Sequence, residues 1–291
     1  MEISYARPRR RPSRLRLWNY WSGKVFKYGV LLIFVLISII PIFWVISTSL
    51  KTSNEVARSP LGPPTQLRVD NYPEAWNQGR FGKYFRNSVY VSIPIVLGTV
   101  SLACLAGYSL ARFNLPGGKA LFYYFLLGLM VPFQSIMIPL FYTLKDIGFL
   151  GTYWAMIVPM IAMGMPFGIF FMRAFFLGLP NELIDAAKID GCNDFDAFWR
   201  VMLPLSGPAI ATLAVFEFMG AWNAFLLPLI YMQKEELRPL VLGLMFFRSR
   251  YTQNIPLTMA GAAIVMIPIV IVYIIFQRKF IQGLTAGAIK G

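Results

Sequence analysis

The sequence contains no histidine and only two cysteines among its 291 residues. Without histidine, a Ser/His or Cys/His catalytic pair cannot form. Cys104 lies inside an apolar run and Cys192 in a polar segment, so a structural disulfide or a zinc site is not expected. The composition therefore indicates neither catalytic residues nor a metal site, and we expect that the chain is not an enzyme.

Charged residues are also scarce: they make up 14% of the chain, whereas 57% of its residues are hydrophobic. Long apolar runs account for this, and each could fill the bilayer core, which needs roughly 20 apolar residues. None of these runs alternates polar and apolar residues as a membrane β-strand would, so helices remain as the way to satisfy the backbone in lipid. The predicted fold class is all-α, a polytopic membrane protein with six transmembrane helices, at about 26–50, 87–111, 120–142, 153–175, 206–231 and 257–279.

Acidic residues are half as frequent as basic ones, 13 against 27, which gives a net charge of +14. A nucleic-acid partner is not expected, because the basic residues lie in loops and tails between apolar runs rather than on one face of a soluble domain. If the N-terminus lies in the cytoplasm, sixteen of the 27 basic residues are cytoplasmic, eight of them within residues 1–27. This asymmetry around the first span predicts a multi-pass protein of the cell membrane with both termini in the cytoplasm.

The predicted organisation is a basic cytoplasmic tail over residues 1–25, a membrane domain over 26–280 and a cytoplasmic tail over 281–291. The loops on the outer side cover about 51–86, 143–152 and 232–256. The first and last of these are long, and they could be solvated connectors or a docking surface for an external partner.

The segment 179–208, between the fourth and fifth predicted spans, is the most informative part of the sequence. Its local chemistry predicts two short cytoplasmic helices. Asn181 is placed to cap the first helix, and Gly191 can take the left-handed conformation that ends it. Asn193 is placed to cap the second helix.

Apolar residues of the second short helix follow one another at positions i, i+3, i+4 and i+7: Phe195, Phe198, Trp199 and Met202. This spacing predicts one apolar stripe, which favours docking into a groove of a partner. The alternative is a helix lying on the lipid surface. Asp194 and Asp196 weaken that alternative, because a leaflet rich in anionic lipid repels them.

This segment resembles the conserved cytoplasmic loop of ABC importer permeases, and the matching residues are Asp185, Ala186, Ala187, Asp190, Gly191, Phe198, Leu203, Pro204 and Pro208. Two positions differ from the usual family pattern, because Asp185 replaces a glutamate and Cys192 an alanine. In that family the loop docks on the ATP-hydrolysing subunit. The resemblance, together with the apolar stripe that adds Phe195 and Trp199, therefore predicts a set of coupling residues: Asp185, Ala186, Ala187, Asp190, Gly191, Phe195, Phe198 and Trp199.

Other stretches, including Asn87-Ser88 and the C-terminal residues 283–291, look like the second membrane subunit of carbohydrate importers of the maltose-transporter type. That resemblance implies a type I ABC importer permease fold that forms half of the pathway for a sugar or oligosaccharide. It also implies three partners: a second permease subunit, an ATPase dimer and an external sugar-binding protein. The sequence lacks a G-x-x-x-x-G-K-[ST] phosphate loop, so we expect ATP and Mg²⁺ to bind the ATPase and no cofactor to bind this chain.

Three residues of the fifth predicted span are candidates for the pathway or the substrate site. Glu217 is an acid deep in the span, where a charge is costly, and it could line the pathway, contact another subunit or bridge two helices. Trp222 and Asn223 combine an aromatic face with an amide, which suits a sugar, although ordinary helix packing explains them as well. Family members often carry an acid after this pair, where this chain has Ala224.

Two alternative functions stay open from the sequence. An ATP-independent secondary transporter or channel would often show paired inverted repeats, and no convincing repeat is present. A permease of the same family for a solute other than a sugar is the second alternative.

Overall fold

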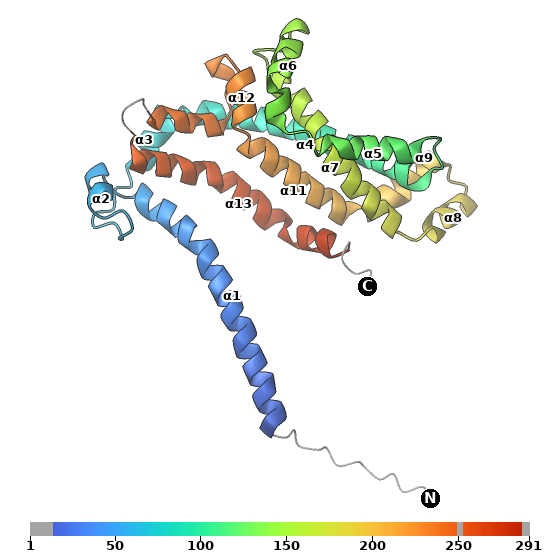
Figure 1. Cartoon of the computed structure of the whole chain (residues 1–291), viewed down its shortest axis with the longest axis horizontal. Coiled ribbons are helices and arrows are strands. Elements are labelled where there is room, and N and C mark those ends of the chain that lie inside the picture. The colour runs from blue at the N-terminus through green and yellow to red at the C-terminus, as the bar shows by residue number, and fades with distance from the viewer. Residues whose placement is uncertain (1–13, 249–252, 287–291) are drawn as a thin grey trace, which may run out of the picture.

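The computed structural model describes residues 14–248 and 253–286, which are mostly helical (Figure 1). The tail residues 1–13 and 287–291, on which part of the predicted charge asymmetry rests, lie outside the described residues. Four helices in the described part are long and apolar enough to cross a membrane: α1 (Arg14–Ser49), α4 (Phe81–Arg112), α7 (Trp154–Gly178) and α13 (Ile255–Ala286). The shortest of these, α7, has 25 residues. A helix of that length extends about 38 Å, which exceeds the hydrocarbon core of about 30 Å.

Two further candidate spans are bent pairs of helices. Helices α5 (Gly118–Gly128) and α6 (Phe133–Asp146) meet at 97°. The segment Asp194–Leu205 and α11 (Gly207–Asn223) meet at 74°. Within the described residues, counting each bent pair as one span gives six spans. The predicted all-α membrane fold is confirmed.

The predicted continuous span at 120–142 is wrong, because the chain breaks between α5 and α6. Residues 129–131 form a short turn in which Met130 N–H donates to Leu127 O at 3.0 Å. Pro132 then takes an extended conformation with ψ of 136°. Proline has no N–H to continue the helical ladder, and it disfavours the helical conformation of the preceding residue. Pro132 therefore explains where the break falls.

The predicted span at 206–231 is also too long, because α11 ends at Asn223 and α12 (Leu226–Tyr231) is a separate short helix. Ala224 between them is extended, with ψ of 121°. In a continuous helix, the ring of Pro228 would clash with the carbonyl of Ala224, four residues earlier. Pro228 therefore accounts for the separation of the two helices.

Helices α4 and α7 pack closely because glycines and alanine remove side chains from their contact. A Cβ added to Gly168 of α7 would lie 2.8 Å from the Cβ of Ala103 on α4. A Cβ added to Gly107 of α4 would lie 2.9 Å from the backbone nitrogen of Arg173 on α7. Real Cβ atoms do not approach so closely, so this seam requires glycine. The two helices therefore form a closely packed pair.

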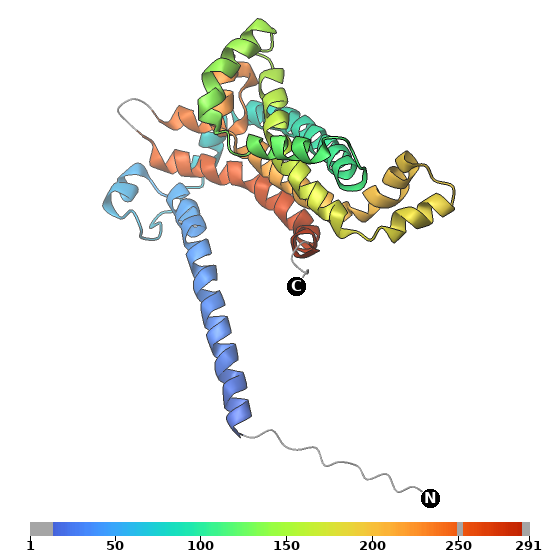
Figure 2. The same cartoon turned by 45° about the vertical axis from the view of Figure 1, so that its right-hand side comes forward.

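Helix α1 leaves the bundle and runs away from the other helices (Figures 1 and 2). None of the residues in its most apolar window is buried within the chain. The C-terminal part of α1 and the residues just after it are attached to the segment that follows: Trp44 Nε1 donates to Pro60 O at 3.1 Å, and the buried Lys51 Nζ donates to Ser59 O at 3.0 Å.

The two long loops opposite α8 contain short helices: α2 (Ser53–Arg58), α3 (Asn71–Gln78), η2 (Glu235–Leu237) and η3 (Leu240–Phe247). Two asparagines hold these loops to the bundle. Asn71 Nδ2 donates to the carbonyls of Ser49 and Lys51, and Asn87 Nδ2 donates to those of Glu236 and Arg238, all at 2.7–2.9 Å. The loops are therefore folded against the helix ends by buried amides.

Candidate functional site: the helical loop between α7 and α11

The predicted loop 179–208 begins with α8 (Glu182–Ile189), which ends in a left-handed turn at Gly191. Gly191 has φ of +83°, and its N–H donates to Lys188 O at 3.0 Å. The N–H of Cys192 donates to Ala187 O at 2.9 Å. These two bonds form a Schellman motif, in which the left-handed position costs a residue with a Cβ about 1–2 kcal/mol. Gly191 therefore ends α8 in the predicted way.

Asn181 does not cap α8, so that prediction was wrong. Its backbone is helical and its side chain makes no capping hydrogen bond. Instead, Asn181 Oδ1 accepts a hydrogen bond from Nη1 of Arg112, the last residue of α4. Nη2 of Arg112 donates to the carbonyls of Phe176 and Leu179, the latter at 2.7 Å, and so satisfies carbonyls at the end of α7. One guanidinium, which we name the Arg112 clamp, thus ties α4 to the end of α7 and the start of α8.

The second half of the loop runs through α9 (Asp194–Ala197), the π-helical turn η1 (Phe198–Met202) and α10 (Leu203–Leu205). Asn193 caps α9 as predicted, because its Oδ1 accepts from the N–H of Asp196 at 2.8 Å. This cap joins residues three apart along the chain, so the local sequence was sufficient to predict it.

An ion pair joins the two halves across the Gly191 turn. Lys188 Nζ lies 2.9 Å from Asp194 Oδ1, and both side chains are about half exposed. The hydrogen bond to this carboxylate raises the pKa of Lys188. Because solvent screens the pair, it contributes little to stability. The angle between α8 and α9 is therefore set mainly by the turn at Gly191, and the ion pair supports it.

The predicted single apolar stripe is wrong, because the four residues divide between two environments. Phe198 and Met202 are buried, at 3% and 0% exposure, whereas Phe195 is 68% and Trp199 48% exposed. A π-helical turn has more residues per turn than an α-helix, so position i+3 turns away from position i while position i+4 stays on the same side. Phe195 and Trp199 therefore share one side, and Phe198 and Met202 the other.

Phe198 packs into the bundle rather than facing outward. Its ring centroid lies 4.9 Å from that of Tyr108 on α4 and 6.5 Å from that of Phe176 on α7. Tyr108 and Phe176 lie 5.4 Å apart in an edge-to-face arrangement, so the three rings form one aromatic cluster. The loop is therefore attached to α4 and α7 twice, by the Arg112 clamp and by Phe198.

Three large apolar side chains near the Gly191 turn, from α8 to η1, are exposed: Ile189 at 87%, Phe195 at 68% and Trp199 at 48%. We name these three residues the loop tip. The loop projects from one end of the bundle (Figures 1 and 2). Sequence analysis missed Ile189, although an isoleucine in the last turn of a helix, directly before Asp190-Gly191, was a usable signal. Of the other predicted coupling residues, Ala187 is buried, and the exposed ones are Asp185, Ala186, Asp190 and Gly191.

Glu217 lies where α11 approaches α7 and α4. A Cβ added to Gly164 of α7 would lie 2.6 Å from Glu217 Oε2 and 2.9 Å from Thr99 Cγ2 of α4. The hydroxyl of Thr99 is buried and has no hydrogen-bond partner among the described residues. The carboxylate is therefore accommodated by the absence of a side chain at Gly164, at a junction of three helices.

Trp222 and Asn223 occupy different environments, so the structure does not bring the three pathway candidates together. Trp222 is 2% exposed, and its Nε1 donates to Val265 O of α13 at 3.1 Å. Its ring also stacks on Phe218, with centroids 5.3 Å apart. Asn223 is exposed at the last position of α11, directly before the break at Ala224. This placement gives Trp222 a packing position between α11 and α13.

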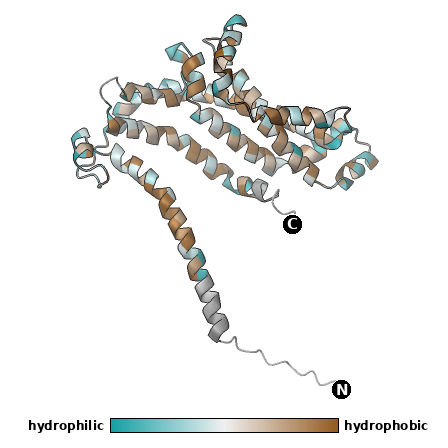
Figure 3. Cartoon of the chain, viewed as in Figure 1, coloured by the Kyte–Doolittle hydropathy of each residue, from teal (hydrophilic) through white to brown (hydrophobic). Residues whose placement is uncertain are grey.

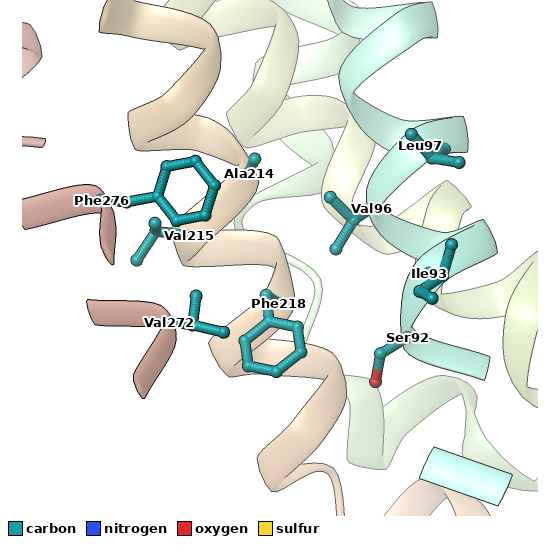
Figure 4. Close-up of a pocket in the computed structure, with 9 residues that line it drawn as sticks. All are labelled: Ser92, Ile93, Val96, Leu97, Ala214, Val215, Phe218, Val272 and Phe276. Atoms are coloured by element: carbon teal, nitrogen blue, oxygen red, sulfur yellow. The ribbon is translucent and has the colours of Figure 1, made fainter. Parts of the chain in front are cut away.

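A pocket of about 250 Å³ opens between α4, α11 and α13 (Figure 4). Apolar side chains such as Val96, Val215 and Phe218 line it, and Ser92 is the one polar residue of its lining. The Ser92 hydroxyl is buried without a hydrogen-bond partner in the described part of the chain. None of the predicted pathway residues lines this pocket, and its lining offers one hydroxyl to a polar solute.

Hydrophobic residues cover the long helices, whereas hydrophilic residues gather at their ends and in the protruding loops (Figure 3). Up to six apolar spans within the described residues, together with a capped helical loop held beyond their ends, define a polytopic membrane protein. The chain belongs to the family of binding-protein-dependent transport system inner membrane components, whose family model matches residues 99–286. It is a permease subunit of an ABC importer, and subunits of this kind are not themselves enzymes. Family membership does not favour the ATP-independent alternative.

Similar proteins cover nearly the whole chain. The diacetylchitobiose uptake system permease protein NgcG of Streptomyces coelicolor is 36% identical, over 90% of this chain and 88% of the relative. The arabinooligosaccharides transport system permease protein AraQ of Halalkalibacterium halodurans is 37% identical, over 88% of this chain and 92% of the relative. A chain of a bacterial ABC transporter that imports the acidic polysaccharide alginate has the same fold, with a TM-score of 0.74 at 22% identity, over 92% of this chain and 99% of that chain.

Proposed function

We propose that this permease forms half of the translocation pathway for a sugar or an oligosaccharide. The names of its relatives support a carbohydrate, since they refer to diacetylchitobiose and to arabinooligosaccharides. The solved structure with the same fold comes from an alginate importer. A non-sugar solute is the alternative within the family.

The coupling role is supported by one observation: the loop tip is apolar and exposed, whereas the rest of the loop is attached to α4 and α7 by Arg112 and Phe198. Phe195 and Trp199 present aromatic surface, and side chains of this type dominate binding energies when a partner buries them. Gly191 and Ala187 shape the turn that carries the tip, and Phe198 attaches it to α4 and α7. In this proposal the tip contacts a separate ATPase subunit, and the exposed Asp185, Ala186 and Asp190 border that contact.

Three partners complete the proposed importer. A second permease covers the exposed surfaces of the spans, and α1, which leaves the bundle, supports such a partner because it extends beyond the chain's own helices. An external binding protein delivers the sugar to the loops that contain α2, α3, η2 and η3. An ATPase dimer binds ATP and Mg²⁺. Closure of the ATPase dimer pulls the loop tip, and the attached α4–α7 pair tilts to expose the pathway alternately to either side.

The proposed orientation has both termini and the loop 179–208 in the cytoplasm. The excess of basic residues within residues 1–27 supports it. In this orientation the loops held by Asn71 and Asn87 face the outside, where the binding protein docks.

A reconstitution experiment tests the transport function. The chain is co-purified with the second permease and the ATPase and placed in liposomes with ATP inside, and the binding protein is added outside. We expect uptake of a labelled oligosaccharide that requires both ATP and the binding protein. Uptake that persists without ATP would contradict the importer mechanism. A binding protein that retains only amino acids, peptides or ions would contradict the sugar assignment and leave the importer mechanism intact.

A further inference from the structure

A second pocket, of about 370 Å³, opens between α4, α5 and α7 at the end of the bundle that carries the loop tip. Its lining combines apolar residues of the α4–α5 connection, such as Phe113 and Leu115, with the cations Lys119 and Arg173. No acidic residue lines the pocket. Neither cation forms an ion pair with a described residue, so the pocket carries uncompensated positive charge.

Arg173 is held in a fixed position at this pocket. Its Nε donates to Leu110 O at 3.2 Å, and its guanidinium lies over the ring of Phe122, 4.2 Å from the centroid. The two Nη groups make no hydrogen bond within residues 14–248 and 253–286. Arg173 lies near the C-terminal end of the apolar helix α7, where a charged side chain can reach the membrane interface. The side chain is therefore oriented with its forked donors available to an anion.

The surroundings of the pocket place it at the depth of lipid headgroups. Tyr123 and Tyr124, on the same helix as Lys119, are 64% and 70% exposed. Exposed tyrosines near the end of a membrane span are typical of the interface between headgroups and acyl chains. Phe113 and Leu115 are also partly exposed, at 39% and 41%, and they provide an apolar wall beside the cations.

We propose that this pocket binds the headgroup phosphate of an anionic phospholipid. The Nη groups of Arg173 match the geometry of phosphate oxygens, and Lys119 provides a second positive charge. Phe113 and Leu115 contact the glycerol and the upper acyl carbons. A soluble phosphate would be attracted by the two cations, but it would gain no binding free energy from the apolar wall formed by Phe113 and Leu115. This proposal stands independently of the transported solute.

The test measures lipid binding to the complete importer complex, purified in detergent, by native mass spectrometry with added phosphatidylglycerol or phosphatidylcholine. We expect phosphatidylglycerol to bind more tightly than phosphatidylcholine. Lys119→Gln should weaken phosphatidylglycerol binding about fivefold, the usual effect of one basic residue near an anionic headgroup. The matched control is Lys145→Gln, which removes an exposed lysine at the end of α6, outside the pocket, and should change nothing.

Arg173→Lys keeps the charge, removes the fork and should also weaken phosphatidylglycerol binding. Equal binding by the wild type, Lys119→Gln and Arg173→Lys would overturn the proposal, as would equal weakening by Lys145→Gln. Displacement of phosphatidylglycerol by millimolar inorganic phosphate would identify a site for soluble anions and would overturn the lipid assignment.

Discussion

Gly191 sets the direction in which the loop tip points, because its left-handed backbone turns the chain from α8 into α9. Proline cannot adopt this conformation, since its ring holds φ near −65°. It would also remove the N–H that bonds to Lys188 O. We therefore expect Gly191→Pro to leave the protein in the membrane but to uncouple ATP hydrolysis from transport. The measurement is ATPase activity stimulated by the loaded binding protein, together with uptake in the same liposomes.

Gly191→Asn is the matched control for this substitution. No atom lies within 4 Å of a Cβ added at Gly191, so a side chain there meets only the cost of the left-handed backbone. Asparagine tolerates that backbone better than other residues with a Cβ. Gly191→Asn should therefore keep most of the coupling. Normal substrate-stimulated ATPase activity in Gly191→Pro would refute the coupling role of this turn.

Arg112 is predicted to hold the start of the loop in place. Arg112→Lys keeps the charge, but a single ammonium cannot reproduce the fork that reaches Asn181, Phe176 and Leu179. Without the guanidinium, the carbonyls of Phe176 and Leu179 lose a hydrogen-bond donor, and the start of the loop opens more often. We therefore expect faster amide hydrogen exchange over residues 176–190 and weaker coupling of ATP hydrolysis to transport. The control is Arg200→Gln, because the Arg200 side chain is 73% exposed and, among the described residues, forms an ion pair with Asp196 alone. Unchanged exchange in Arg112→Lys would show that the clamp does not hold the loop.

At the scale of the element, η1 separates the residues that attach the loop from those that can bind a partner. Phe195→Ala with Trp199→Ala removes exposed rings, so we expect the permease to keep its thermal stability and to lose the ATPase subunit on gel filtration. Phe198→Ala removes a buried ring from the cluster with Tyr108 and Phe176, and we expect destabilisation of about 3–5 kcal/mol. If Phe198→Ala were stable and the exposed pair destabilising, this division of roles would be wrong.

The same element shows how far the sequence determines the structure. The turn at Gly191 and the cap at Asn193 depend on neighbours within a few residues, so local spacing predicted both. The burial of Phe198 and the exposure of Trp199 depend on the positions of α4 and α7 in space. The spacing of apolar residues along one helix gives no information about those positions. The prediction that Asn181 caps α8 failed for a similar reason. Its actual partner, Arg112, lies 69 residues away along the chain, and local spacing gives no information about that contact.

The spans show a related limit. The apolar runs located the four continuous spans and both bent pairs of the described residues, because the bilayer requires length and hydrophobicity whatever the packing, but they did not show where the bent pairs break. Pro132 and Pro228 were visible in the sequence, but proline is common in membrane helices and neighbouring helices can re-satisfy the freed carbonyls. Only the packed structure distinguishes the prolines that break a helix from those inside α4, α7 and α13, namely Pro94, Pro159, Pro166 and Pro268.

For the whole molecule, the direction of transport depends on which side of the membrane carries the loop, and the two native cysteines allow this to be measured. Cys192 is partly exposed beside Gly191, whereas Cys104 is buried within α4 at 3% exposure. A membrane-impermeant maleimide added to intact cells should leave the protein unlabelled. The same reagent should label inside-out vesicles, and Cys192→Ala should abolish that labelling while Cys104→Ala should not.

The opposite face provides the complementary measurement. Lys234 lies just before η2, on an exposed part of the loops that we place outside. In a protein with Cys104→Ala and Cys192→Ala, Lys234→Cys should be labelled in intact cells. Labelling of Cys192 in intact cells would place the loop tip outside, where no ATPase can reach it. Coupling requires the loop tip and the ATP-bound ATPase to lie on the same side of the membrane. With the tip outside, ATP hydrolysis could not power transport, and the importer proposal would be wrong even though the helical bundle would be unchanged.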